Sequence, residues 1–119
     1  MVAVGITSKG KRLKFVCSDD NLYCHNSDLV SLEVPEGVKR ILCRNNKLSE
    51  LKLPESVKEV SCYDNKLTEL IIPEGLKTVF CWNNKLTELT IPDSVTSLIC
   101  DKEVSGLEEI IDKIKILLC

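Results

Sequence analysis

Cysteine and histidine are the side chains in this sequence that could hold a metal ion, form a disulfide or act in catalysis. The 119-residue chain contains seven cysteines and one histidine, His25. Six of the cysteines follow one another at steps of 19 residues: Cys24, Cys43, Cys62, Cys81, Cys100 and Cys119. None of them forms the closely spaced CxxC pair that zinc sites commonly use. We therefore expect no metal site and no cofactor.

Catalysis would have to rest on His25, because the chain offers no other histidine as a general base. No serine or cysteine is identifiable as its nucleophilic partner, and the sequence contains no GxGxxG, GxxxxGK(S/T) or HExxH motif. Carboxylates recur because the sequence repeats, which is typical of solvated surface rows. We predict that the protein has no catalytic residues and is not an enzyme.

The cysteine spacing belongs to an internal repeat of 19 residues. The prolines keep the same step, at Pro35, Pro54, Pro73 and Pro92. Aliphatic residues recur five and two positions before the cysteine and five, eight and ten positions after it. A period near 20 is typical of small units that stack into a solenoid, and the chain is long enough for a single domain, residues 1–119.

Each repeat is expected to contribute one short strand. Inward-facing residues alternate around the cysteine, as at Ile41 and Cys43, so the strands would stack in parallel about 4.8 Å apart. The asparagines three positions after the cysteine, Asn46, Asn65 and Asn84, should bond the backbone of their own and adjacent repeats. A turn beginning at proline follows, and the roughly eight residues on the outer side leave room for extended or 3₁₀ backbone only.

One repeat, residues 38–56, reads VKRILCRNNKLSELKLPES and follows the consensus LxxLxCxxNxLxxLxLPxx. This pattern resembles the leucine-rich repeat signature LxxLxLxxNxL, with cysteine in the third apolar position. It is similar to the short repeats of bacterial effector-type proteins, and the resemblance covers residues 20–100. The resemblance implies a mostly β member of the α/β solenoids, a right-handed superhelix with one parallel strand per repeat.

The N-terminal cap is expected in residues 1–19, which depart from the repeat. An apolar run, residues 2–7, and the segment 12–16, in which charged and apolar residues alternate, flank a Ser-Lys-Gly turn. This arrangement predicts a β-hairpin that covers the first full repeat.

The C-terminal cap is expected in residues 101–119. Ser105 can cap a helix N-terminus, and the aliphatic residues after it recur at helical spacing, which predicts a short helix over 105–113. Ile114, Leu117 and Cys119 then return to the repeat spacing and predict a last strand.

The in-phase cysteines are expected to be free thiols that serve as small core residues. In-register parallel strands would hold neighbouring Cβ atoms too far apart for an unstrained disulfide. Cys17 and Cys119 are better candidates for an intermolecular bridge. Reduced thiols favour a reducing compartment, the cytoplasm or, for a translocated effector, the host cytoplasm.

Charge and hydropathy exclude two classes of partner. The net charge of −2 at pH 7 provides no basic surface for a nucleic acid or an anionic membrane. The apolar run before Thr7 is too short for a signal peptide or a membrane span. We expect neither partner, and we expect no export by the common route.

The residues on either side of each cysteine should point away from the core. Eight of them form a candidate partner-binding surface on a concave strand face: Tyr23, His25, Leu42, Arg44, Tyr63, Phe80, Trp82 and Ile99. Four of the five aromatic residues of the chain belong to this set. Aromatic and arginine side chains dominate binding hot spots, although the same residues could instead form ladders that stabilise the sheet or pack under the caps. Polar residues would form a rim: Arg40, Asn45, Glu59, Asp64 and Asn83.

These features favour a non-catalytic module that binds a protein or peptide through the concave face, the usual mode in leucine-rich repeat proteins. Two alternatives remain open. One is a self-assembling scaffold, in which the concave face or the last strand pairs two copies into a homodimer. The other is the substrate-recognition part of a bacterial effector that lacks its catalytic domain.

Overall fold

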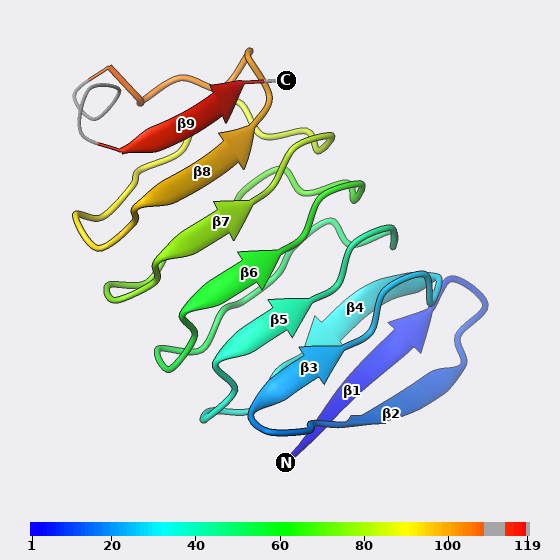
Figure 1. The fold of residues 1–119 in the computed structure, drawn as a ribbon. Helices are drawn as coiled ribbons and strands as arrows, with labels where there is room; N and C mark the ends of the chain where they lie inside the picture. Colours follow the sequence, from blue (N-terminus) through cyan, green and yellow to red (C-terminus); the bar gives the residue numbers. More distant parts are fainter. Residues whose placement is uncertain (109–113, 119) are drawn as a thin grey trace.

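The computed structural model describes residues 1–108 and 114–118 of the chain. Within these residues the chain forms nine β-strands and no helix. Six strands build a parallel sheet in the order β3-β5-β6-β7-β8-β9, and three build an antiparallel sheet in the order β2-β1-β4 (Figure 1). The molecule is a β-solenoid that carries a small second sheet at its N-terminal end.

The parallel sheet confirms the prediction of one short strand per repeat. Its strands are β3 (Asn21–Tyr23), β5 (Arg40–Leu42), β6 (Glu59–Ser61), β7 (Thr78–Phe80), β8 (Ser97–Cys100) and β9 (Lys115–Leu118). From β3 to β8 each residue pairs with the residue 19 positions further along, as Ile41 pairs with Val60. Equivalent residues of successive repeats therefore form straight rows across the sheet.

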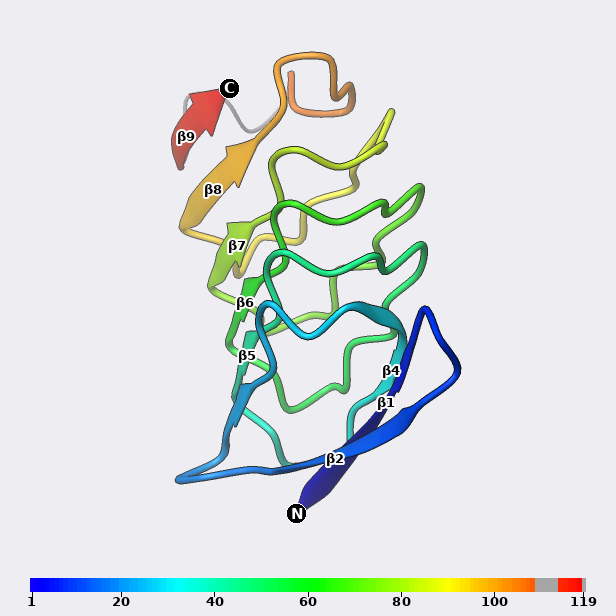
Figure 2. The same ribbon diagram turned by 90° about the vertical axis from the view of Figure 1, so that its right-hand side faces the viewer.

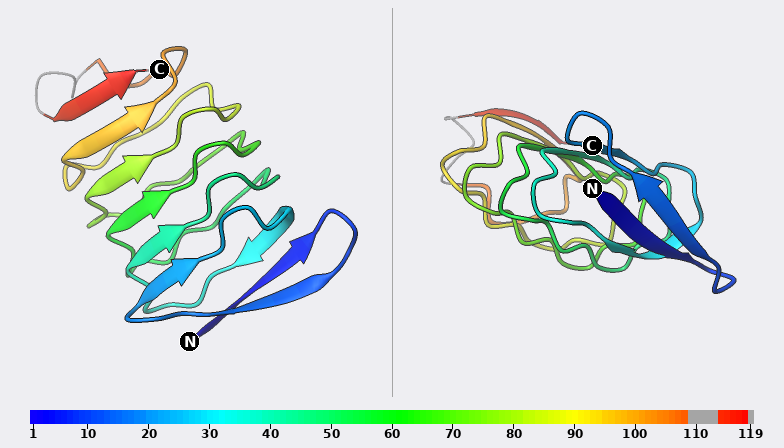
Figure 3. Two further views of the ribbon diagram at one scale, coloured as in Figure 1. Left: turned by 45° about the vertical axis from the view of Figure 1, so that its right-hand side comes forward. Right: turned by 90° about the horizontal axis from the view of Figure 1, so that it is seen from below.

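The core lies between this sheet and the outer segments, which return the chain from the end of one strand to the start of the next (Figure 2). Viewed along the stack, each turn is a flattened loop with the strand on one long side (Figure 3). The cysteines of the five described repeats are buried, as are the aliphatic residues two positions before them: Leu22, Ile41, Val60, Val79 and Leu98. Burying a Leu, Ile or Val side chain contributes roughly 1.5–3 kcal/mol, so these columns supply much of the driving force for stacking.

The asparagine ladder is confirmed in detail at Asn65. Its side-chain NH2 donates to the carbonyls of Cys43 and Cys62, at 3.0 and 3.1 Å, and its Oδ1 accepts from the Leu48 N–H at 3.0 Å. Asn46 and Asn84 repeat this pattern one turn away on either side. Each amide thus pairs backbone groups of two successive turns at the place where the chain leaves the strand.

The proline turns also form as expected. The Val57 N–H donates to the Pro54 carbonyl at 3.2 Å, which closes a β-turn beginning at proline. Successive turns are joined by serine: the Ser56 hydroxyl accepts from the Gly37 N–H at 2.9 Å and donates to the Val38 carbonyl at 2.8 Å. Ser94 joins the next pair of turns in the same way. In the described part of the chain the outer segments between these turns and the strands contain no α-helix, as predicted, and no 3₁₀ helix either.

The N-terminal hairpin is confirmed, with strands β1 (Val2–Thr7) and β2 (Arg12–Val16) pairing antiparallel. An additional strand, β4 (Leu29–Glu33), extends this sheet by pairing antiparallel with the other edge of β1. The two strands approach closely at Gly5, where a Cβ would lie 2.6 Å from Leu29 Cδ2, so a larger residue there would displace the Leu29 side chain. The cap is thus joined to the outer side of the first full repeat.

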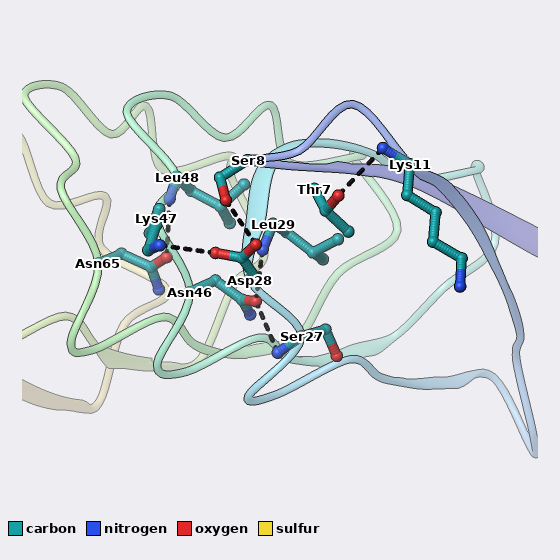
Figure 4. Close-up of polar contacts among 10 residues, drawn as sticks. All are labelled: Thr7, Ser8, Lys11, Ser27, Asp28, Leu29, Asn46, Lys47, Leu48 and Asn65. Atoms are coloured by element: carbon teal, nitrogen blue, oxygen red, sulfur yellow. Dashed lines mark hydrogen bonds and ion pairs between the residues drawn. The ribbon is translucent and has the colours of Figure 1, made fainter.

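Asp28 fastens this cap to the solenoid (Figure 4). Its carboxylate accepts from the Ser8 hydroxyl at 2.5 Å and forms an ion pair with Lys47 Nζ at 2.7 Å. The Ser8 N–H also donates to the Asp28 carbonyl at 3.0 Å. The hydrogen bonds from Lys47 and Ser8 lower the pKa of Asp28 below its ordinary value. The Asp28 carboxylate therefore links the hairpin turn, the first full repeat and the second repeat through its contacts with Ser8 and Lys47.

The predicted helix over 105–113 is wrong for residues 105–108, while residues 109–113 lie outside the described part of the chain. The Ser105 N–H donates to the Thr87 carbonyl, and the Ser105 carbonyl accepts from the Leu89 N–H, both at 3.0 Å. Gly106 has a φ of +94°, which belongs to the left-handed region, and a Cβ there would lie 2.4 Å from the Leu89 carbonyl oxygen. Ser105 therefore continues the stacking of the outer segments instead of starting a helix.

The last strand forms, but its predicted register is wrong by one residue. Leu98 pairs with Ile116 rather than with Leu117, so the final step is 18 residues instead of 19. Because successive residues of a strand face opposite sides, this shift sends Ile116 toward the core and Leu117 to the opposite face. Leu117 is accordingly 57% exposed. The expected inward position of Cys119 lies outside the described residues.

Candidate binding face

The outward side of the parallel sheet carries two rows of residues, which together we call the strand face. The first row contains the residue before each cysteine: Tyr23, Leu42, Ser61, Phe80 and Ile99. Strand pairing places these five residues side by side in register. Four of the five are large and at least partly accessible, so the row forms an apolar band across the sheet.

The second row contains the residue after each cysteine: His25, Arg44, Tyr63, Trp82 and Asp101. Backbone hydrogen bonds between successive repeats continue past the ends of the strands and keep this row in register. The Asn45 N–H donates to the Tyr63 carbonyl and the Asp64 N–H donates to the Trp82 carbonyl, both at 3.1 Å. After His25, the row contains the cationic Arg44, then the two aromatic residues, and it ends at the acidic Asp101.

Tyr63 and Trp82 are in direct contact. Their ring centroids are 3.8 Å apart and their planes differ by 7°, so the rings are stacked, and Phe80 lies tilted against Trp82 with centroids 6.3 Å apart. Three of the four aromatic residues proposed for this surface therefore form one cluster. Tyr23 lies at the far end of the first row and is 46% exposed.

Ser61 lies in the first row, next to Phe80 of this cluster. It pairs in register with Leu42 on one side and Phe80 on the other, yet only 6% of its surface is exposed. The larger neighbours therefore cover the small side chain and close the row over it.

Polar residues border the cluster on both sides, and several of them bond to one another. Arg40 forms an ion pair with Glu59 at the start of the strands. Beyond the ends of the strands, Asn83 Nδ2 donates to Asp64 Oδ1 at 2.7 Å. The turn residues there share a left-handed φ of +52 to +56°, which asparagine and aspartate tolerate better than other non-glycine residues: Asn26, Asn45, Asp64 and Asn83. The expected polar rim is thus a regular feature of the repeat.

One residue of this face, Leu117, escaped the sequence analysis. Leu117 pairs with Ile99 and extends the apolar row by one strand, a placement that depends on the one-residue shift of β9. Asp101 accepts from the backbone N–H groups of Asn83 and Asn84, at 2.8 and 3.2 Å, and so closes the acidic end of the second row. The 19-residue spacing places Asp101 in the second row, but it gave no sign that Leu117 faces outward.

The buried cysteines behave as core residues with suppressed reactivity. Burial raises the pKa of Cys24 to about 12, and it raises the pKa of Cys43 and Cys62 well above the ordinary value. Neighbouring thiols add to the effect in each case. Thiols that stay protonated at neutral pH are poor nucleophiles and poor metal ligands.

The five described cysteines of the repeats, Cys24 to Cys100, follow one another in a line through the stack. Among residues 1–108 and 114–118, no group of three or more histidine, cysteine, aspartate or glutamate side chains is arranged to hold a metal ion. The same residues contain no helix able to cross a membrane.

No protein-family model, curated protein or solved structure matches this chain. The strand face therefore has to be interpreted from its own geometry. The stacked rings and the apolar row of the strand face offer contact area, and the residues of the polar rim offer hydrogen-bonding groups.

Proposed function

We propose that this protein is a non-catalytic interaction module that binds a protein or peptide through the strand face. The proposal is carried by the concentration of four of the five aromatic residues on the outward side of a sheet whose core is complete without them. A repeat core needs no aromatic residue on its solvent side, whereas aromatic residues and arginine are the side chains that most often dominate binding energy.

The chemistry of the two rows describes the expected partner. The stack of Tyr63 and Trp82, together with Phe80, would contact an apolar patch, and Arg44 and Asp101, on opposite sides of the stacked pair in the second row, would orient it. Complementary charges at such margins affect the rate and orientation of association more than the affinity. The partner is therefore a protein surface or segment with an apolar centre.

We also propose that the repeats are of the leucine-rich type and that the protein works in a reducing compartment. The strand in each repeat and the buried asparagine column support the first proposal. The reduced thiols of Cys24, Cys43, Cys62 and Cys81 support the second and favour a cytoplasmic location.

Affinity capture from native lysate tests the main proposal. The intact chain, a Tyr63→Ala/Trp82→Ala variant and a Val16→Ala/Val30→Ala variant are immobilised, and bound proteins are quantified by mass spectrometry. Val16 and Val30 are matched controls because they are exposed apolar residues outside the strand face. We expect a partner that the native chain and the control retain and the face variant loses. Equal recovery on all three chains would refute the proposal.

Self-assembly is the second candidate, favoured by the geometry of β9. This strand is the last of the parallel sheet, and its residues Leu117 and Leu118 are 57% and 44% exposed. An accessible edge strand is a template for pairing with another chain. Light scattering over a concentration series separates the candidates, because a strict monomer at high concentration excludes self-assembly.

A further inference from the structure

Trp82 ends the stack of rings on the strand face. Tyr63, in the preceding repeat, lies on one face of the indole, with ring centroids 3.8 Å apart and planes within 7° of parallel. The opposite face of the indole is therefore turned toward the following repeat, where the residue in the same row is Asp101. Aspartate has no ring to continue the stack, and Trp82 is partly accessible. A planar group of another molecule can extend the stack on this side.

Asp101 departs from the backbone pattern of the earlier repeats. In three of them the N–H of the turn residue donates to a backbone carbonyl of the next repeat, always at 3.1 Å: Asn26 to Arg44, Asn45 to Tyr63 and Asp64 to Trp82. In the fourth, the Asn83 N–H donates instead to Oδ1 of the Asp101 side chain at 2.8 Å, and the Asn84 N–H donates to Oδ2 at 3.2 Å. These bonds hold a carboxylate directly beside the backbone of Trp82.

The Asp101 carboxylate has capacity for a further partner. Each oxygen of an ionised carboxylate carries two lone pairs, and each oxygen of Asp101 accepts one backbone hydrogen bond. The ion pairs within residues 1–108 and 114–118 are Arg40–Glu59 and Lys47–Asp28, so none of them involves Asp101. The turn needs an acceptor here, which a neutral amide also provides. The fold of the described residues therefore does not account for the negative charge.

We propose that the strand face binds an arginine side chain of its protein partner, with the guanidinium stacked on the Trp82 indole and paired with the Asp101 carboxylate. This inference rests on the proposed function and specifies the chemistry of the partner. A guanidinium is planar, stacks on aromatic rings and donates two parallel N–H bonds to a carboxylate, whereas the ammonium of lysine has no such plane.

The surroundings of Trp82 also fit an arginine in this orientation. Ile99 pairs in register with Phe80 in the neighbouring row and offers apolar contact to the methylene stem of the arginine. Arg44 lies in the same row as Asp101 but three strands away, roughly 14 Å at the usual strand spacing. A cationic group of the partner is therefore directed to the Asp101 side of the stack and repelled from the other side.

The test is a titration of the intact chain with N-acetyl-arginine amide at constant ionic strength. Trp82 is the only tryptophan, so its fluorescence reports stacking, and the amide NMR signals of Asn83 and Asn84 report contact with Asp101. We expect saturable binding with a dissociation constant on the order of 10 mM, as for one exposed cation–π contact and one surface ion pair.

Two further probes separate shape from charge on the unchanged protein. N-acetyl-citrulline amide has the planar shape of arginine without its charge and should bind at least about fivefold more weakly. N-acetyl-lysine amide has the charge without the plane and should bind about threefold more weakly. Equal affinity for arginine and citrulline, or for arginine and lysine, would overturn the proposal, as would the absence of saturable binding.

A pair of matched variants locates the site. Asp101→Asn keeps an acceptor for the Asn83 N–H and should weaken arginine binding about fivefold through loss of the ion pair. Glu103→Gln removes an exposed carboxylate two residues further along and should change it less than about twofold. Equal weakening by both variants would reduce the effect to general charge attraction and overturn the proposal.

The proposed function and this inference can fail separately. If the native chain captures a partner that Tyr63→Ala/Trp82→Ala loses, but the arginine probe does not bind, the arginine site is refuted and the proposed function stands. A captured partner that Asp101→Asn binds as tightly as the native chain does would likewise refute the arginine site alone.

Discussion

The indole ring of Trp82 stacks on the phenol ring of Tyr63, with centroids 3.8 Å apart and planes within 7° of parallel. The two residues occupy equivalent positions in successive repeats, so the parallel register of the sheet brings them together. A stacked pair on an exposed face both stabilises the sheet and preorganises a contact surface. These two contributions can be measured separately.

The stack should contribute a measurable but small part of the folding free energy. We expect a double-mutant cycle of Tyr63→Ala and Trp82→Ala to give a coupling energy of about 0.5–1.5 kcal/mol, the usual range for aromatic pairs. Urea unfolding followed by circular dichroism measures it for the four chains. A coupling of several kcal/mol would indicate that these rings hold the fold, which is the packing interpretation of the strand face.

The asparagine ladder should matter more for stability than any surface residue beside it. Asn65→Ala leaves the carbonyls of Cys43 and Cys62 with an amide from Asn46 or Asn84, but it removes the acceptor of the buried Leu48 N–H. We expect a loss of about 2–3 kcal/mol in the free energy of unfolding.

The adjacent Lys66→Ala is the control for this change, because Lys66 is exposed. It should change the same free energy by less than about 0.5 kcal/mol. Urea midpoints at constant slope compare the three chains, and equal stabilities for the two variants would contradict the ladder's role.

Asp28 should make the stability of the N-terminal cap depend on pH. Because the folded state lowers the pKa of Asp28 from its ordinary value of 3.8, the carboxylate stabilises the fold above that pH. This contribution is lost as the pH falls through the lowered folded value. Asp28→Asn keeps a residue that tolerates the φ of +57° but removes the ion pair with Lys47.

Thermal unfolding of both chains between about pH 7 and pH 2 measures this effect. The native chain should be the more stable at neutral pH, and the two should converge in acid and in high salt. Asp19→Asn is the control, since Asp19 lies in a turn with a φ of +52°. A difference for Asp28→Asn that stays constant with pH would contradict the assigned ion pair.

The buried thiols should resist alkylation until the solenoid unfolds. Iodoacetamide at mildly alkaline pH should modify the partly exposed Cys17 well before Cys43 and Cys62, which are fully buried and whose pKa values burial raises. Peptide mapping by mass spectrometry follows each site, and denaturant should make their rates similar. Early labelling of Cys43 or Cys62 would show that the stack opens locally.

The regular part of this structure could be predicted because each repeat obeys the same local rules. The spacing of cysteine, aliphatic residues and asparagine specifies which side chains face inward, and the N-terminal hairpin follows from alternation and turn residues. The eight residues proposed for the strand face are all carried on the strands or directly after them. Whether they bind a partner remains a prediction.

Where the repeat ends, local rules were insufficient. Nothing in residues 29–33 indicates that β4 pairs antiparallel with β1, because this pairing depends on how the cap folds back over the first full repeat. At the other end, Ser105 has the sequence features of a helix cap, yet hydrogen bonds to Thr87 and Leu89 and the left-handed Gly106 keep it in the stack. The one-residue shift of β9 likewise departs from the 19-residue spacing, so tertiary packing and not the local sequence pattern sets the register of this strand.

The affinity of Trp82→Ala for the captured partner, measured by isothermal titration against the native chain, tests the proposed function most directly. Trp82 lies at the centre of the aromatic cluster, between Tyr63 and Phe80. We predict at least about a tenfold increase in the dissociation constant, equivalent to about 1.4 kcal/mol, from a chain that remains folded. A change of less than about twofold in a folded variant would contradict the assignment of the strand face as the binding surface.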